Sequence, residues 1–361
     1  MRTMLLPIFL AFGLSLLAAA ACGGGAGTAA ALERSSDDDD NDTSGDDDGS
    51  PDDDDNDNDN DDDDSGAAWS EMTSGTDVLL SGVWGSSPSD VFVVGKSPTS
   101  ITLHYDGVSW SPMPIGANYG LANVWGLSPS DVYGVGLSGS AGAVLHYDGT
   151  AWAPMPIDLP SDSFLSGVWG LSSSDVFAAG EGEDGPLIAH YDGASWSWTN
   201  PPTAGVLSRV WGVSHTDVFA VGQGGTTLRY DGATWSAMTT GTEGFLSDVW
   251  GASGSDVFAV GLDETNNVTV LLHYDGNAWS SANYSVPDFG LEGVWGSSSS
   301  DIFVVGGGNQ SDASLVVHFD GASWSTMQLP SGITGTLMAV YGFSPTDVFV
   351  VGDEGTILHY N

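Results

Sequence analysis

The sequence predicts an all-β fold, a seven-bladed β-propeller of four-stranded antiparallel blades closed by its N-terminal strand. A unit built around Val-Trp-Gly, Asp-Val-Phe-x-x-Gly and Leu-His-Tyr-Asp-Gly-x-x-Trp recurs seven times. The central aromatic residues are spaced by 41, 44, 42, 39, 45 and 46 residues, a period typical of propeller blades. They are Trp84, Trp125, Trp169, Trp211, Trp250, Trp295 and Tyr341. The last copy stops at Asn361 before its final Trp strand, and a matching piece, residues 68–72, precedes the first copy.

Each copy contains four short segments of strand character. In the first copy they are residues 80–85, 91–95, 101–105 and 110–113. The second segment is apolar on both faces, which is typical of a strand between two neighbours. Pro88 and the Ser and Asp residues around it predict a turn, because proline sets φ and short polar side chains bond the nearby backbone. Asp106-Gly107 predicts a tight hairpin.

A single blade of this kind cannot stand alone, because both of its faces are apolar. In a ring, the Trp, Phe and Val residues of adjacent blades cover one another. Completing the last blade with the N-terminal strand also removes an exposed sheet edge. We therefore expect the strand that contains Trp69 to pair with the strand that contains Tyr360.

Residues 1–22 have the features of a lipoprotein signal peptide. Arg2 precedes an apolar stretch that is short for a membrane span, and small residues follow it. Cys22, the one cysteine, comes directly after them. This placement resembles a bacterial lipobox, whose cysteine is acylated and becomes the mature N-terminus, although Ala19 stands where leucine is usual. The alternative is an ordinary cleaved signal with a bystander cysteine.

Acylation of Cys22 would hold the mature protein at the outer membrane or cell surface of a bacterium, because several acyl chains bind a membrane far better than one. Gly23 lacks the acidic character that retains some lipoproteins at the inner membrane, which favours the outer membrane. Membrane contact is expected through this lipid anchor only.

Residues 23–66 are expected to form a disordered, Asp-rich tether that precedes the propeller of residues 67–361. Between residues 37 and 64 the chain is almost entirely Asp and Asn, so it has nothing to bury and repels itself. Weak calcium binding by these carboxylates is the alternative, although the ordered spacing of a dedicated calcium loop is absent.

The charge of the chain restricts its partners. The formal net charge is −43, and the propeller region holds only three Lys and Arg residues, Lys96, Arg209 and Arg229. So acidic a surface repels phosphate backbones, which argues against nucleic acid as a partner. We expect a monomer.

The end of the repeat resembles the Asp-box (BNR) hairpin of sialidase-like propellers. The motif Asp-Gly-x-Ser/Thr-Trp begins at Asp106, Asp192, Asp231 and Asp320. The aspartate precedes the tryptophan by four residues here and by five in the Asp-box. The whole repeat is also similar to tandem units of bacterial surface lipoproteins. The resemblance implies a propeller fold and no particular activity, because Asp-boxes are structural turns.

The loops that differ between copies form the candidate functional face. In a propeller, the loops entering the inner strand and those joining the second and third strands emerge together, and here both kinds vary. The turns at the opposite end hardly change. We expect structural roles for the histidine that recurs on the third strand and for the aspartate before the second strand, the aspartate as a turn cap.

Two departures from the repeat give candidate ligand-binding residues. Trp198 follows Trp196 by two, and an exposed indole there would stack on a sugar ring, with extra packing as the alternative. Arg209 and Asp248 occupy equivalent inner-strand positions of adjacent blades. We expect them to pair near the mouth of the central channel, either for a ligand or as a structural ion pair.

Acidic residues on the same loops are weak metal candidates. Calcium binding on this face, or simply a solvated rim, is expected of Asp263, Glu264, Asp353 and Glu354. No other cofactor and no catalytic residue is assigned.

These features favour a membrane-anchored extracytoplasmic binding or scaffold module that presents a loop-rich propeller face to a glycan or protein partner. A sialidase-like glycoside hydrolase, as the resemblance implies, needs an arginine cluster for its substrate, and two arginines cannot supply one. A hydrolase with two catalytic carboxylates and a purely structural envelope component are the alternatives, because fold alone does not decide function.

Overall fold

The computed structural model describes residues 66–361 except 96–99, 117, 285–288 and 309–311. The predicted signal peptide and tether, with Cys22, therefore lie outside the described residues. Within the described part of the chain, no helix is long and apolar enough to cross a membrane.

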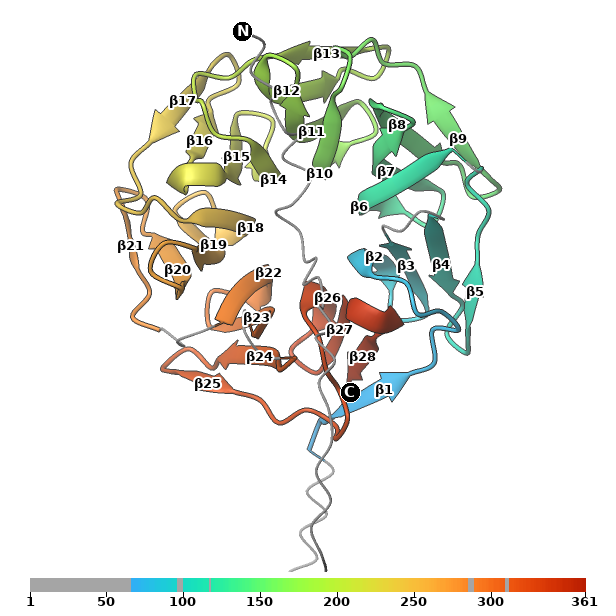
Figure 1. The fold of residues 1–361 in the computed structure, drawn as a ribbon, viewed down its shortest axis with the longest axis vertical. Helices are drawn as coiled ribbons and strands as arrows, with labels where there is room; N and C mark the ends of the chain where they lie inside the picture. Colours follow the sequence, from blue (N-terminus) through green and yellow to red (C-terminus); the bar gives the residue numbers. More distant parts are fainter. Residues whose placement is uncertain (1–65, 96–99, 117, 285–288, 309–311) are drawn as a thin grey trace, which may run out of the picture. The chain divides into compact units, whose positions relative to one another are not determined.

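Seven four-stranded antiparallel sheets form a ring, which confirms the predicted fold (Figure 1). The innermost strands, nearest the axis, are β2 (Leu80–Ser87), β6 (Tyr119–Ser128), β10 (Phe164–Ser172), β14 (Leu207–Ser214), β18 (Phe245–Ser253), β22 (Phe289–Ser298) and β26 (Leu337–Ser344). The second strands are β3 (Asp90–Gly95), β7 (Asp131–Ser138), β11 (Asp175–Gly182), β15 (Asp217–Gly222), β19 (Asp256–Asp263), β23 (Asp301–Gly308) and β27 (Asp347–Gly352).

The third strands are β4 (Ile101–Tyr105), β8 (Ala141–Tyr147), β12 (Gly185–Tyr191), β16 (Thr227–Tyr230), β20 (Val268–Tyr274), β24 (Ser314–Phe319) and β28 (Ile357–Tyr360). The outer strands are β5 (Trp110–Pro112), β9 (Trp152–Met155), β13 (Trp196–Thr199), β17 (Trp235–Met238), β21 (Trp279–Ser281), β25 (Trp324–Thr326) and β1 (Trp69–Met72). Two short 3₁₀ turns, η1 (Gln223–Gly225) and η2 (Asp353–Gly355), replace longer loops in blades 4 and 7.

The N-terminal strand closes the ring as predicted. β1 pairs with β28 in antiparallel register, with Trp69 opposite Tyr360, and so supplies the outer strand of blade 7. Trp69 is buried and its ring lies 5.1 Å from that of Tyr360 and 6.4 Å from that of Phe303 in blade 6. The seam is therefore held by both main-chain pairing and interblade packing.

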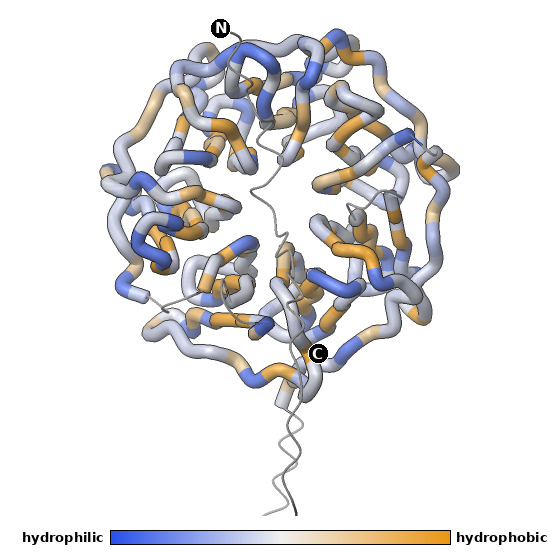
Figure 2. Tube along the Cα trace, viewed as in Figure 1, coloured by the Kyte–Doolittle hydropathy of each residue, from blue (hydrophilic) through white to orange (hydrophobic). Residues whose placement is uncertain are grey.

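The core lies between the blades. The second-strand phenylalanines are almost completely buried, and hydrophobic residues follow the strands within the blades (Figure 2). Each inner-strand tryptophan lies against the glycine of the next blade: a Cβ built on Gly126 would lie 2.8 Å from the Trp84 ring. The same contact recurs around the ring up to Trp295 and Gly342.

Blade 7 keeps this contact with a different residue. Its central aromatic is the smaller Tyr341, and the ring that lies against Gly85 of blade 1 belongs to Phe343, 2.6 Å from where a Cβ would stand. Tyr341 and Phe343 pack edge to face with centroids 5.5 Å apart. The pair together fills the space that a tryptophan fills elsewhere.

The recurrent aspartate and histidine bind each other. In six blades the aspartate that begins the second strand places Oδ1 2.7 to 2.8 Å from Nε2 of the third-strand histidine. In blade 4 Arg229 replaces histidine and donates two hydrogen bonds to Asp217, at 2.7 and 3.0 Å. These carboxylates therefore join two strands of one blade, and those of Asp90 and Asp301 also accept a hydrogen bond from a serine on the other side of the turn.

The Gly126 contact yields a testable prediction. Gly126→Ala should lower the free energy of unfolding by about 1–3 kcal/mol, because the new methyl group would overlap the Trp84 ring and the Asp131 carbonyl oxygen. Gly120→Ala on the same strand is the control, since its Cβ would meet nothing closer than Ser100 Oγ at 3.6 Å. Urea denaturation measures both, and equal stability of the two variants would contradict the proposed contact.

Candidate functional site

The variable loops emerge at one end of the ring. In blade 1 the start of the inner strand pairs with the end of the second, Leu80 with Gly95, and Gly95 pairs with Ile101 at the start of the third. The loops that enter inner strands and those that join second to third strands therefore share one face, as predicted. We name it the loop-bearing face.

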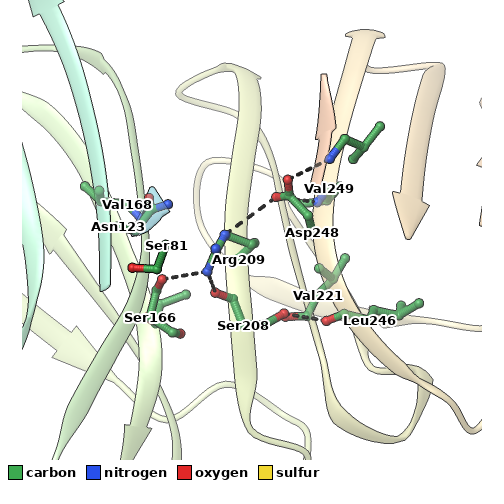
Figure 3. Close-up of polar contacts among 12 residues, drawn as sticks. Ser81, Asn123, Ser166, Val168, Ser208, Arg209, Val221, Leu246, Asp248 and Val249 are labelled. Carbon is green, nitrogen blue, oxygen red and sulfur yellow. Dashed lines mark hydrogen bonds and ion pairs between the residues drawn. The ribbon is translucent and has the colours of Figure 1, made fainter. Parts of the chain in front are cut away.

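Arg209 links three blades beside the axis (Figure 3). From inner strand β14 its Nη1 donates hydrogen bonds to the carbonyl oxygens of Ser166 in blade 3, at 2.8 Å, and of Ser208, at 3.1 Å. Its Nε lies 3.7 Å from Oδ1 of Asp248 in blade 5. The predicted pair of Arg209 and Asp248 therefore forms, in a half-buried position.

Asp248 extends the linkage to blade 6. Its Oδ2 accepts a hydrogen bond from the Val294 N–H at 3.0 Å, and its Oδ1 accepts one from the Val249 N–H at 2.9 Å. Burial raises the pKa of Asp248, while Arg209 and these two N–H groups favour the ionised form. Asn123 makes the corresponding contact in blade 2, where its Oδ1 accepts a hydrogen bond from Val168 N–H at 3.3 Å.

Glu292 is the functional candidate that the sequence analysis missed. It stands on β22 where blades 1, 3, 4 and 5 carry serine, one residue upstream of the position of Arg209 and Asp248. Those serines in blades 1, 3 and 4 donate hydrogen bonds to carbonyl oxygens of the following inner strand. In blade 5, Ser247 instead hydrogen bonds to the Glu292 carboxylate. The sequence signal for this residue is its replacement of serine at the repeat position directly before that of Arg209 and Asp248.

The surroundings of Glu292 set its protonation. Burial raises the pKa of Glu292 to about 7, and the negative charges of Asp248 and Asp353 add to the rise. Ser247 and the guanidinium of Arg209 oppose it. Glu292 can therefore gain or lose a proton near neutral pH, and a cation placed beside it would favour the charged form.

Trp198 lies apart from this group. It belongs to outer strand β13 of blade 3, whereas Arg209 and Asp248 are on inner strands, so the structure does not combine the three candidates in one site. The Trp198 side chain is 40% exposed, and its Nε1 donates a hydrogen bond to the Asp158 carbonyl oxygen at 2.8 Å. The indole therefore anchors the loop between blades 2 and 3 and leaves part of its surface free.

The candidate calcium residues lie on loops of blades 5 and 7, which are not neighbours. Asp263 accepts hydrogen bonds from the N–H groups of Thr265 and Asn266 within its own loop. Asp353 Oδ2 accepts one from Thr336 N–H at 2.8 Å. The described residues contain no group of three or more His, Cys, Asp or Glu side chains placed to hold a metal ion. Calcium binding stays a prediction.

The opposite face also carries exposed apolar side chains. Leu127, Leu171 and Val213, each two residues after the central tryptophan of blades 2, 3 and 4, are 38 to 44% exposed. A hollow of about 620 Å³ lies beside Leu127, lined in part by Trp84, Trp125 and Tyr341. The regular turns of this end therefore do not make it purely polar.

Comparison with known proteins shows the fold. No protein-family model matches the chain, and no curated protein matches its sequence. A structure of YCF48 bound to D1 peptide covers 81% of this chain and 96% of its own, with a TM-score of 0.62 and 16% identity. Virginiamycin B lyase from Staphylococcus aureus covers 82% and 99%, with a TM-score of 0.66 and 10% identity. The WD40 propeller domain of Doa1 covers 82% and 97%, with a TM-score of 0.64 and 12% identity.

These structures include a peptide complex, a lyase and a WD40 domain, and their identity to this chain is low. The likeness therefore establishes a seven-bladed β-propeller and leaves its activity to be argued from the residues.

The pKa of Glu292 predicts a pH dependence of stability. The folded protein retains a proton that the unfolded chain releases between pH 4.5 and about 7, so the contribution of Glu292 to stability is lost as the pH rises through this range. Glu292→Gln cannot ionise. The free energy of unfolding of this variant minus that of the wild type should increase by on the order of 1–3 kcal/mol as the pH rises from 5 to 8.

Urea denaturation at several pH values measures this difference. Glu71→Gln, at an exposed position of β1, is the control for the change in net charge. A stability difference between Glu292→Gln and the wild type that stays constant from pH 5 to 8 would contradict the raised pKa.

Proposed function

We propose that this chain is a protein-binding propeller whose loop-bearing face holds a basic segment of its partner. The observation that carries the proposal is the charge of that face. Its loops present exposed carboxylates at Asp77, Asp158, Asp162, Glu183, Asp184, Glu243, Glu264, Asp312 and Glu354. Among the described residues the one Lys or Arg near this face is Arg209, which is already paired with Asp248.

Side chains on the inner strands also favour a basic partner. Arg209, Asp248 and Glu292 come from three consecutive blades, with Asp353 close enough to act on Glu292. This group contains three carboxyl groups and one guanidinium, so this part of the face favours a cationic side chain of a partner. The YCF48 structure contains a bound D1 peptide, so a propeller of similar fold can bind a peptide.

The finer parts of the proposal follow the sequence. Acylated Cys22 holds the propeller at the outer membrane or cell surface through the tether of residues 23–66. No catalytic residue is assigned. A glycan partner is the second candidate, supported by the exposed part of Trp198. A carbohydrate-active enzyme and a structural envelope component are the remaining alternatives.

Electrostatic binding predicts a strong dependence on salt. A fluorescent lysine-rich peptide should bind the protein, and its Kd should rise about tenfold or more between 50 and 300 mM NaCl, because salt screens charge attraction. Replacing Glu183 and Asp184 by Gln and Asn should weaken binding several-fold, whereas Glu71→Gln should not. Fluorescence anisotropy measures these constants. Equal binding of an acidic peptide of the same length would refute the proposal.

Acylation of Cys22 predicts how the protein fractionates. In a bacterial host, the wild-type protein should partition with membranes and incorporate a labelled fatty acid, because the thiol is the acylation site of a lipobox. Cys22→Ala should lose the label and appear in the soluble fraction. Labelling that persists in Cys22→Ala would show that the anchor is elsewhere.

A further inference from the structure

A second hollow lies on the loop-bearing face, at blade 4 and away from the inner strands. Its volume is about 490 Å³, within the range of about 300–1,000 Å³ that small-molecule sites occupy. It is bounded by η1, by the start of β16, by the end of β17 and by residues 239–243, which follow β17. It contains neither Arg209, Asp248 and Glu292 nor Trp198.

The short turn η1 makes this hollow. Gly224 and Gly225 both have φ +67°, which favours glycine. A Cβ on Gly225 would lie 2.0 Å from the Thr242 carbonyl oxygen, so only glycine allows the two loops to approach. At Gly224 a Cβ would meet nothing within 4 Å, because this residue faces open space.

Hydroxyl groups dominate the chemistry of the hollow. Six threonines line it: Thr203, Thr226, Thr227, Thr239, Thr240 and Thr242. Thr203 and Thr226 hydrogen bond to each other at 3.1 Å, and Thr240 Oγ1 donates to the Gly225 carbonyl oxygen at 3.0 Å. Each hydroxyl has one donor and two acceptor sites, so these contacts leave hydrogen-bonding capacity for a ligand.

The other lining groups restrict the ligand. The hollow contains no Lys, Arg or His, so an anion would find no counter-charge. Glu243 supplies one carboxylate, and Leu228 and Met238 supply apolar surface. A neutral ligand that carries many hydroxyl groups and some C–H surface suits this combination, which is the chemistry of a sugar ring.

Thr227 distinguishes blade 4 from five other blades, and blade 1 carries Thr102 there with the same buried, unpartnered hydroxyl. Thr227 is 1% exposed, it lines the hollow, and its hydroxyl oxygen has no hydrogen-bond partner in the protein. A buried hydroxyl without a partner destabilises a fold by about 1–3 kcal/mol. Five other blades carry an aliphatic residue at this third-strand position, namely Val144, Ile188, Leu271, Val316 and Ile357.

Blade 7 provides an internal comparison. The sequence Met-Thr-Thr-Gly-Thr of residues 238–242 recurs there as Met-Thr-Ser-Gly-Thr in residues 72–76, beside the second short turn, η2. Gly355 approaches the Thr76 carbonyl oxygen as Gly225 approaches that of Thr242. The loop geometry is therefore shared scaffold. What differs in blade 7 is Ile357 in place of Thr227, and Asp353 and Glu354 in place of Gln223 and Gly224.

We propose that the threonine-lined hollow of blade 4 is a saccharide-binding site that takes one ring of a neutral sugar. The threonines of the two facing loops, among them the exposed Thr239, supply its hydrogen bonds. The site is separate from the proposed protein-binding surface and does not depend on it.

The test titrates the full-length protein with glucose, galactose, mannose and N-acetylglucosamine and their β-linked disaccharides, followed by saturation-transfer NMR and calorimetry. At least one sugar should bind saturably. Thr239→Val should weaken it by about tenfold, the effect of losing one good hydrogen bond. Thr73→Val is the matched control, because Thr73 occupies the same position of the related loop in blade 7, and it should leave the affinity unchanged.

A second variant tests the place of binding without touching the core. Gly224→Asn adds a side chain over the hollow, and asparagine tolerates positive φ, so the variant should fold and lose the sugar. Binding of no sugar in the panel would overturn the proposal. So would a sugar that binds both variants as tightly as the wild type, or one whose binding is lost only in Trp198→Ala.

Discussion

The contact between each inner-strand aromatic ring and the glycine of the next blade determines how closely the seven blades approach one another. Any Cβ at these glycines would overlap the neighbouring ring or the adjacent backbone. Blade 7 shows how strict the requirement is. Its central residue is Tyr341, and Phe343 supplies the ring that lies against Gly85. The constraint is therefore a filled volume beside the glycine, and the identity of the residue that fills it can vary.

The same close approach explains where polar side chains stand near the axis. At Gly82, Gly167 and Gly293 an added Cβ would lie 2.8 to 3.1 Å from the neighbouring inner strand, so these three blades have little room there. At the equivalent position, Asn123 and Asp248 bond to the following inner strand, and Arg209 bonds to the preceding one. Interblade hydrogen bonds thus replace close backbone packing in part of the ring. Glu292 extends this polar region, and its confinement raises the pKa to about 7.

Two different chemistries coexist on the loop-bearing face. Around the inner strands, carboxylates outnumber the single guanidinium, which favours a cationic partner. At blade 4, a short glycine turn opens a hollow lined by neutral hydroxyl groups. The charged group arises where three consecutive blades depart from the repeat, and the hollow arises at the short turn of blade 4. The propeller therefore gives a constant frame on which local changes create distinct surfaces.

The sequence by itself determined the number of blades, their strands, the closing strand and the adjacency of Arg209 and Asp248. Residue spacing is enough for these features, because a repeat assigns every residue to a blade and a strand position. The tertiary structure decided which side chains meet between elements. The pairing of Asp90 with His104 joins two strands, the environment of Glu292 combines three blades and a loop, and the hollow brings Thr203 to Thr226 and Thr240 to Gly225. Such contacts depend on side-chain direction, loop length and burial, which the period of a repeat does not encode.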